Sequence, residues 1–190
     1  MALSDVMIAN EALSMLGEPR ITVLTQDVPR AKALNEVFVS VRESCLRRYP
    51  WSFAIARASV AADGDPTEWG VLNRYRKPSD FLRLIRDDET GRRNDWAIEG
   101  LFIVTRDAAP LEFKYIRKVT DPQEFDSLFD EYFAVALAVR TCKAITGSNG
   151  QLADLRQEMK RVVAEARQVN AFEKDAQVSL DDDWVLAGHI

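Results

Sequence analysis

Hydrophobic residues recur at two different spacings along this chain, and the order of these spacings limits the folds open to it. In residues 4–50 and 121–173, apolar side chains return every three or four positions, which is typical of helices packed along one face. Residues 51–120 instead contain short apolar runs between turn-forming residues, which is typical of strands. We therefore expect an α+β fold that is mainly α, with a bundle of about four helices and an inserted antiparallel β-rich region.

The first two predicted helices have recognisable ends. Ser4 is a plausible N-cap for a helix that ends at Gly17, and Asp27 can cap a second helix that has Pro29 in its first turn. Pro50 ends the second helix. A helix of about 20 residues is roughly 30 Å long, which is enough to line a bundle.

The β-rich region is predicted to hold short strands at regular spacing. The apolar runs lie at residues 53–60, 72–76, 81–85, 97–99, 101–105 and 111–116. Glu99-Gly100 joins two of them as a tight hairpin would. Because helices do not alternate with these strands, we expect an antiparallel meander rather than parallel β-α-β units.

Two further helices and a tail are expected after the strands. Asp121-Pro122 opens a helical region that ends near Thr146-Gly147, and a second apolar stripe follows the short Gly147–Gly150 connection. The two helices should therefore be antiparallel neighbours. The chain is interpreted as one domain, residues 1–173, with helical parts 4–50 and 121–173, the β-rich insertion 51–120, and an extended C-terminal tail at 174–190.

Composition and charge exclude some classes of function. Hydrophobic residues make up 47% of the 190-residue chain, which is enough for a core. The 30 acidic and 25 basic side chains give a formal charge of -5, which argues against binding of nucleic acid over a broad surface. No apolar run reaches the roughly 18 residues of a membrane span, and the start lacks the features of a signal peptide. Cys45 and Cys142 lie far apart in apolar segments, so we expect two buried thiols in the cytoplasm.

The sequence offers little for catalysis. His189 is the sole histidine and lies next to the C-terminal residue, so no histidine is available to activate a serine or to build an ordinary zinc site. Gly147–Gly150 lacks the lysine and spacing of a phosphate-binding loop. A carboxylate site for magnesium or calcium stays open, since acidic residues are plentiful. We predict a protein that is not an enzyme and needs no cofactor.

Candidate interface residues are basic or aromatic. Arg74 and Arg76 would point the same way from a strand, and Arg92-Arg93 belong to a charged loop with many acidic neighbours. Alternating charges usually mark a solvated face or ion pairs between proteins. Trp184 follows the acidic run that contains Asp182, so it either folds back on its own domain or inserts into a partner.

Several segments, in a fixed order, resemble one family. The helix at residues 33–48 running into Tyr49-Pro50-Trp51-Ser52-Phe53-Ala54 resembles the junction of phage head-to-tail adaptor proteins, of the tail tubular protein A type of short-tailed phages. The similar pieces that follow are residues 75–83, 96–100, 111–116, 121–126 and 144–148. The resemblance covers nearly the whole chain and is weakest after Phe172.

The resemblance implies a structural role in the virion. It implies a helical bundle with a β-rich extension, copies of which form a ring, usually a dodecamer, between the portal protein and the tail nozzle or tube protein. DNA would pass through the channel as cargo, no membrane would be involved, and the free chain could be a monomer. The protein would lie at the head-tail junction after assembly in the host cytoplasm. By position, Arg74, Arg76 and the loop with Arg92 and Arg93 would face the tail component or an adjacent subunit, and Trp184 would reach the portal.

Two rival interpretations remain open at this point. The chain could be a head-completion or stopper connector of a long-tailed phage with the same helical core. It could also be a nucleic-acid-binding assembly factor, in which basic residues interleaved with aromatic ones would contact the strand.

Overall fold

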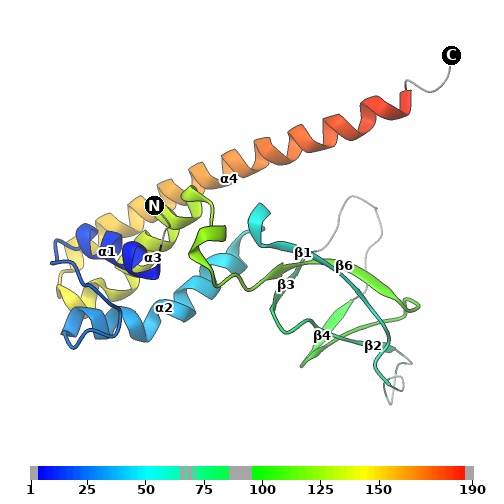
Figure 1. Ribbon diagram of the computed structural model, residues 1–190, viewed down its shortest axis with the longest axis horizontal. Helices are drawn as coiled ribbons and strands as arrows, with labels where there is room; N and C mark the ends of the chain where they lie inside the picture. Colours follow the sequence, from blue (N-terminus) through cyan, green and yellow to red (C-terminus); the bar gives the residue numbers. More distant parts are fainter. Residues whose placement is uncertain (1–3, 65–66, 68–69, 71, 86–95, 187–190) are drawn as a thin grey trace. The chain divides into compact units, whose positions relative to one another are not determined.

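The computed structural model describes residues 4–64, 67, 70, 72–85 and 96–186 (Figure 1). At residue 167 and residues 170–186 it describes the backbone alone. The chain forms two compact units, one made of residues 1–45 with 121–190 and the other of residues 46–120. Each unit is described separately below. Among the described residues there are four α-helices and six strands, so the fold is α+β.

The first unit is helical, and local capping fixes where its helices begin. α1 (Asp5–Met15) begins after Ser4, whose side chain accepts a hydrogen bond from the backbone N–H of Met7. α1 ends before Gly17, which has a φ of 73° that suits the left-handed end of a helix. The predicted first helix is confirmed. The side chain of Asn10 bonds both the N–H and the C=O of Ile21, which ties the following loop to α1.

The second helix, α2 (Pro29–Arg48), begins at the predicted proline. Its entry differs from the prediction in one respect. Asp27 lies two residues before the helix and forms an ion pair with Lys32 at 2.5 Å, and the C=O of Val28 accepts the first helical hydrogen bond. The residue that occupies the cap position is therefore Val28, because Pro29 takes the first helical position next to it.

The third helix, α3 (Ser127–Ile145), forms the centre of this unit. It begins at Asp126, whose carboxylate accepts a hydrogen bond from the N–H of Leu128 at 2.7 Å. Its buried side chains lie on every side of the helix rather than on one stripe, and include Phe129, Phe133 and Leu137 at 0% exposure. A helix that is apolar all round is one that other elements surround.

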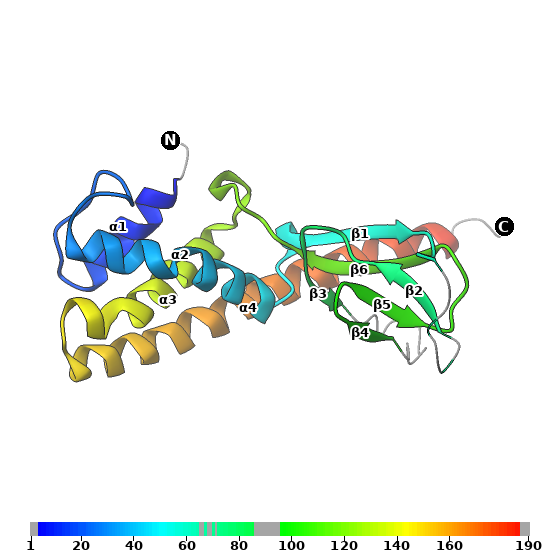
Figure 2. The same cartoon turned by 90° about the horizontal axis from the view of Figure 1, so that it is seen from below.

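The fourth helix, α4 (Asn149–Leu186), packs against α3. The two run antiparallel, as predicted, since the connection is short and Arg161 of α4 forms an ion pair with Glu131 of α3 (Figure 2). α1 also packs on α3, and the ring of Phe38 from α2 meets that of Phe133 at 5.1 Å between centroids. The described helices α1, α2 and α4 thus all pack against α3.

The expectation of an extended tail from residue 174 is wrong. α4 continues to Leu186 and has 38 residues, twice the 19 of α3. The sequence between Asn170 and Leu186 contains no Gly and no Pro, so nothing in it ends a helix once one has formed. At 1.5 Å per residue α4 is about 57 Å long and α3 about 28 Å.

The second unit contains two three-stranded antiparallel sheets, ordered β1-β6-β3 and β2-β5-β4. The strands are β1 (Ile55–Val60), β2 (Asn73–Arg76), β3 (Phe81–Ile85), β4 (Ala97–Glu99), β5 (Phe102–Thr105) and β6 (Leu111–Arg117). A 3-10 turn, η1 (Ser52–Ala54), precedes β1, and another, η3 (Pro122–Glu124), precedes α3 in the helical unit. The strands lie close to the predicted positions.

The antiparallel pairing is confirmed, but the expected meander is wrong. β4 and β5 form the predicted hairpin, with Glu99 opposite Phe102 and Gly100 at a φ of 55°. The other pairs are nested: β1 pairs with β6 and β2 with β5. In a meander each strand would instead pair with the next one along the chain. Inner-face residues of both sheets form one core, which contains Tyr75, Ile103 and Phe113.

Candidate functional site

The predicted interface arginines of β2 lie on the face of their sheet away from Tyr75, because neighbouring residues of a strand alternate. Tyr75 is fully buried and its hydroxyl donates to the C=O of Asp107 at 2.7 Å. The guanidinium of Arg74 lies over the Phe102 ring, 4.2 Å from its centroid. Arg76 is exposed. Arg74 is thus held against its own sheet, and Arg76 presents its charge at the surface.

The other predicted interface residues have side chains that lie outside the described part of the chain. Arg92 and Arg93 lie outside the described residues. Asp182 and Trp184 fall within α4, where the backbone is described and the side chains are not.

A cationic face that the sequence interpretation missed lies on the outer side of the β1-β6-β3 sheet. Strand register places Arg57 opposite Lys114, and Lys114 opposite Ile85. A second row across the same face contains Arg83, and a third row pairs Ser59 with Glu112. We name Arg57, Lys114 and Arg83 the cationic face; Glu112 is the acidic residue beside it.

Arg47 adds a fourth cation next to this face. It lies in the last turn of α2, and its Nη1 donates to the C=O of Leu82 at 3.0 Å. Burial, and then the positive charge of Arg47, lower the pKa of Arg83. The Nε of Arg83 is buried and makes no hydrogen bond to the described part of the chain. The two guanidinium groups therefore lie near each other, an arrangement that an anionic group would stabilise.

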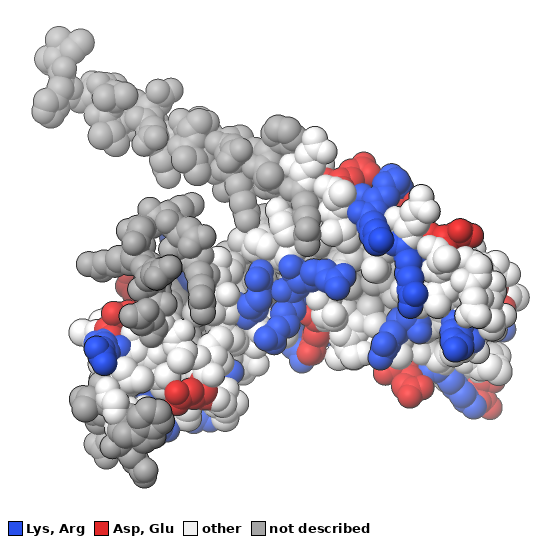
Figure 3. Space-filling view, turned by 180° about the vertical axis from the view of Figure 1, so that it is seen from behind, with Lys and Arg blue, Asp and Glu red and all other residues white. Residues whose placement is uncertain are grey.

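A pocket of about 770 Å³ opens beside Arg83, between the edge strands β3 and β4. Its lining is largely apolar and includes Leu84, Ile85, Trp96 and Ile98. The Trp96 ring packs edge-on against Phe113, and Ile98 is 49% exposed. Figure 3 shows one face of the molecule, on which Lys and Arg side chains gather in groups with acidic ones at their margins. Arginines beside apolar side chains are the composition that protein interfaces favour.

The junction segment behind the family resemblance contains a buried tryptophan. Trp51 is 1% exposed. Its ring meets that of Tyr49 at 5.3 Å and that of Phe53 at 6.4 Å. The resemblance at Tyr49–Ala54 therefore involves residues that connect α2 to β1. These residues have a role in the fold and give no evidence of a binding contact.

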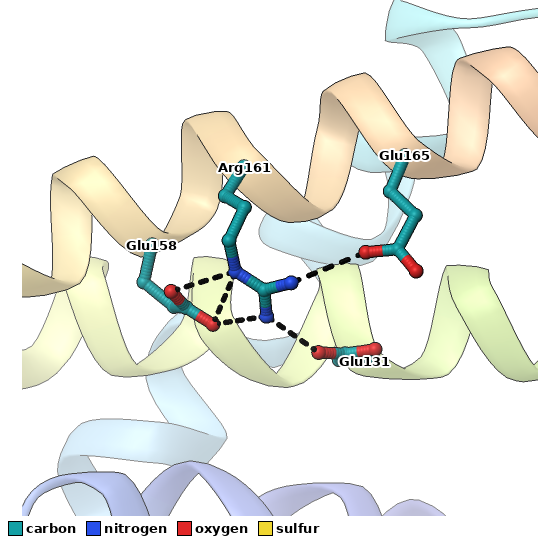
Figure 4. A network of polar contacts seen from close by, with 4 residues as sticks. All are labelled: Glu131, Glu158, Arg161 and Glu165. Carbon is teal, nitrogen blue, oxygen red and sulfur yellow. Dashed lines mark hydrogen bonds and ion pairs between the residues drawn. The ribbon is translucent and has the colours of Figure 1, made fainter.

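The helical unit carries a surface ion network between α3 and α4 (Figure 4). Arg161 contacts Glu158 at 2.6 Å, Glu165 at 3.2 Å and Glu131 at 3.7 Å. The hydrogen bond between Arg161 and Glu158 raises the pKa of the arginine and lowers that of the glutamate. All four side chains are well exposed, so the network adds little stability.

A second group of carboxylates lies where α1 faces the start of α3. Burial, followed by the charges of Glu11 and Asp126, raises the pKa of Asp130 to about 7. Burial and the charge of Glu131 raise the pKa of Glu11. These groups destabilise one another when ionised. Within the described residues no group of three or more His, Cys, Asp or Glu side chains is placed to hold a metal ion.

The remaining site predictions concern the cysteines and the membrane. Cys45 and Cys142 are both buried free thiols, as predicted. In the described part of the chain, no helix combines the length and the apolar character that crossing a membrane requires. Neither the comparison with protein-family models nor the search of curated proteins finds a match.

Proposed function

We propose that this chain is a structural virion protein that forms a ring adaptor between the head portal and the tail nozzle or tube of a bacterial virus, with a channel for DNA. The order of sequence segments around Tyr49–Ala54 supports this proposal. The structural observation that carries it is the length of α4. A helix of 38 residues beside an antiparallel partner of 19 has a second half with no α3 alongside it.

That second half suits contact with another protein. α3 begins at Ser127 and its Glu131 lies beside Arg161, so α4 extends beyond the start of α3 from about residue 166 onward. A helix of about 20 residues gains most of its stability in a protein from packing of one face. Val169, the last residue of α4 with a described side chain, is 39% exposed. In the proposed adaptor, this part of α4 contributes surface for the portal or for a neighbouring copy.

Deletion of residues 178–190 tests the proposal. We expect the shortened chain to fold with an unchanged thermal midpoint, because the described cores lie elsewhere, and to lose binding to the portal protein of the same virus. Light scattering of size-separated mixtures, with and without portal, measures the binding. Failure of the full-length chain to bind the portal would overturn the proposal, whereas a monomeric state of the free chain would not.

A nucleic-acid-binding assembly factor is the second candidate, and the cationic face favours it. Residues 46–120 contain 14 basic and 11 acidic side chains, whereas the rest of the chain contains 11 and 19. A titration with duplex DNA at low and at physiological salt distinguishes the two functions. Tight binding whose affinity falls steeply as salt rises supports the second candidate, and no binding at low salt removes it.

A further inference from the structure

Two strands of the β unit have a neighbour on one side only. Among the described residues β3 pairs with β6 and β4 pairs with β5, and each strand lies at the end of its three-stranded sheet. Beyond this pairing, residues 83–85 and 97–99 make no backbone hydrogen bond to the rest of the described chain. An edge strand directs every second N–H and C=O away from its sheet. These groups are therefore available to an additional strand.

The two edges line one pocket, which we name the β3–β4 pocket (Figure 2). Its volume is about 770 Å³. Its lining includes Leu84 and Trp96, which also pack against the core cluster of the β unit. Ile98 is 49% exposed and lies opposite the buried Ile103, so it is on the core-facing side of its own sheet. The β3–β4 pocket is therefore an opening between the two sheets that leads to their shared core.

An extended segment is the ligand that fits both the edges and the opening. It can hydrogen-bond a strand edge along its length and direct every second side chain into the apolar pocket. A small ligand would not reach a row of backbone groups, and a helix satisfies its own. Each of the six described strands already has a partner, and residues 86–95 contain no large apolar side chain. The segment therefore comes from another protein.

Arginine side chains define the charge that this segment carries at one end. Arg83 lines the β3–β4 pocket, and no described carboxylate forms an ion pair with its guanidinium. Arg47 lies nearby, since its Nη1 donates to the C=O of Leu82 at 3.0 Å. A carboxylate on the incoming segment would supply the counter-charge that both guanidinium groups lack in the described chain.

We propose that the β3–β4 pocket binds an extended segment of a partner protein by strand addition, with apolar side chains at alternate positions in the pocket and an acidic side chain beside Arg83. Main-chain hydrogen bonds to a strand edge supply affinity in this mode of binding, and the pocket supplies specificity. The inference goes beyond the proposed adaptor function and does not depend on it, because the edges and the pocket lie within the β unit.

A peptide titration of the full-length chain tests the site. The probe is the peptide Glu-Val-Thr-Val-Thr-Val-Glu with blocked ends, which has an acidic side chain at either end and so allows both strand directions. Amide hydrogen exchange resolved by nuclear magnetic resonance is the measurement. At saturating peptide, in the millimolar range, we expect exchange to slow at least about tenfold at amides within residues 83–85 or 97–99.

Modified peptides separate strand addition from general apolar binding. One version is N-methylated at its valines and another at its threonines, so both keep the side chains while each lacks one set of N–H donors. The version without the donors that face the strand edge should give no protection. A version with Gln at both ends should bind the wild type several-fold more weakly, because it has no charge for Arg83.

Two variants test the lining, with a third as the matched control. Ile98→Asp adds a carboxylate at a half-exposed position of the pocket, and should weaken binding of the acidic peptide at least about tenfold. Arg83→Gln should remove the preference for the acidic peptide over the Gln version. Val39→Asp makes the same kind of change at a residue of α2 that is 51% exposed, and should leave both affinities unchanged.

Several outcomes would overturn the inference. One is that the acidic peptide slows no exchange within residues 83–85 or 97–99, and another is that both N-methylated versions protect these amides as well as the parent peptide does. Protection that is present in the chain alone and disappears on dilution would assign the opening to a second copy, and would also overturn it. An unchanged peptide preference in Arg83→Gln would contradict the acidic side chain of the proposed segment.

Discussion

Among the described acidic residues, Asp130 is the one whose ionisation most opposes the fold. It lies in the first turn of α3 with a carboxylate oxygen that is buried and makes no hydrogen bond to the described residues. Burial and the nearby Glu11 and Asp126 raise its pKa from 3.8 to about 7. The folded chain therefore holds a proton at Asp130 that the unfolded chain releases near pH 4.

Replacing Asp130 by Asn should stabilise the protein in a pH-dependent way. Because the folded pKa is raised, the proton's contribution to stability is complete below about pH 4 and is lost as the pH rises to about 7. Asp130→Asn should then have little effect at pH 4 and should increase the free energy of unfolding by roughly 1 kcal/mol at pH 8, after allowance for solvent screening. Urea unfolding at both pH values measures this difference.

Asp154→Asn is the control for that experiment. Asp154 is exposed on α4, so its replacement should change stability by less than about 0.5 kcal/mol at either pH. An Asp130→Asn variant that is less stable than the wild type at pH 8 would contradict the prediction.

Features of the fold that depend on neighbouring residues in the sequence are predicted correctly. Pairings between strands far apart in the sequence are not. The β4–β5 hairpin follows from Glu99-Gly100, since a tight turn needs only its own residues. The pairing of β1 with β6 joins Ile55 to Ile116 across sixty-one positions, and the spacing of short strands contains no information on such partners. The cationic face was missed for the same reason, because Arg57 and Lys114 become neighbours only through this register.

The C-terminal part of α4 shows a different limit of sequence reasoning. The apolar pattern weakens after Phe172, and this weakening predicts an extended chain. The helix nevertheless continues to Leu186. Propagation from an existing helix costs much less than nucleation, so absence of a helix breaker was the more informative signal.

Two glycines at element ends should respond oppositely to the same substitution. Gly100 has a φ of +55° in the hairpin, so Gly100→Ala should lower the free energy of unfolding by about 1 kcal/mol. Gly150 lies in the first turn of α4 without a positive φ, and an added Cβ meets no atom within 4 Å. Gly150→Ala should therefore raise the free energy of unfolding by about 0.5–1 kcal/mol. Thermal unfolding of both variants tests the pair, and a shift in the same direction for both would refute it.

At the scale of the whole molecule, two buried cores occur in one chain. The helical unit is centred on α3, and the β unit on the cluster that contains Tyr75, Ile103 and Phe113. α2 is continuous from the first unit into the second, since it ends at Arg48 and the second unit begins at Leu46. Charge is also divided, with a net excess of acidic residues in the helical unit and of basic residues in the β unit. Each unit therefore has its own buried core and its own sign of net charge.

Two cores of this kind should unfold in two transitions that different probes detect. Three of the four tryptophans, Trp51, Trp69 and Trp96, belong to residues 46–120, so fluorescence follows mainly the β unit. Far-ultraviolet circular dichroism follows mainly the four helices. We expect the urea midpoint measured by fluorescence to differ from the midpoint measured by circular dichroism. Coincident midpoints would instead indicate that the whole chain unfolds in one two-state transition.

Substitutions in each core show whether the transitions are separate. Phe113→Ala removes a side chain that is 6% exposed. It should lower the free energy of unfolding of the β unit by about 3 kcal/mol and so lower the urea midpoint seen by fluorescence. The midpoint seen by circular dichroism should change little. Ala138→Leu adds volume at a fully buried position of α3. It should lower the free energy of unfolding of the helical unit by about 1–3 kcal/mol and so lower the urea midpoint seen by circular dichroism. Ala144→Leu, at an exposed position of the same helix, should change neither. If both core variants shift both signals equally, the two units unfold as one body, and α2 transmits the loss of either core to the other.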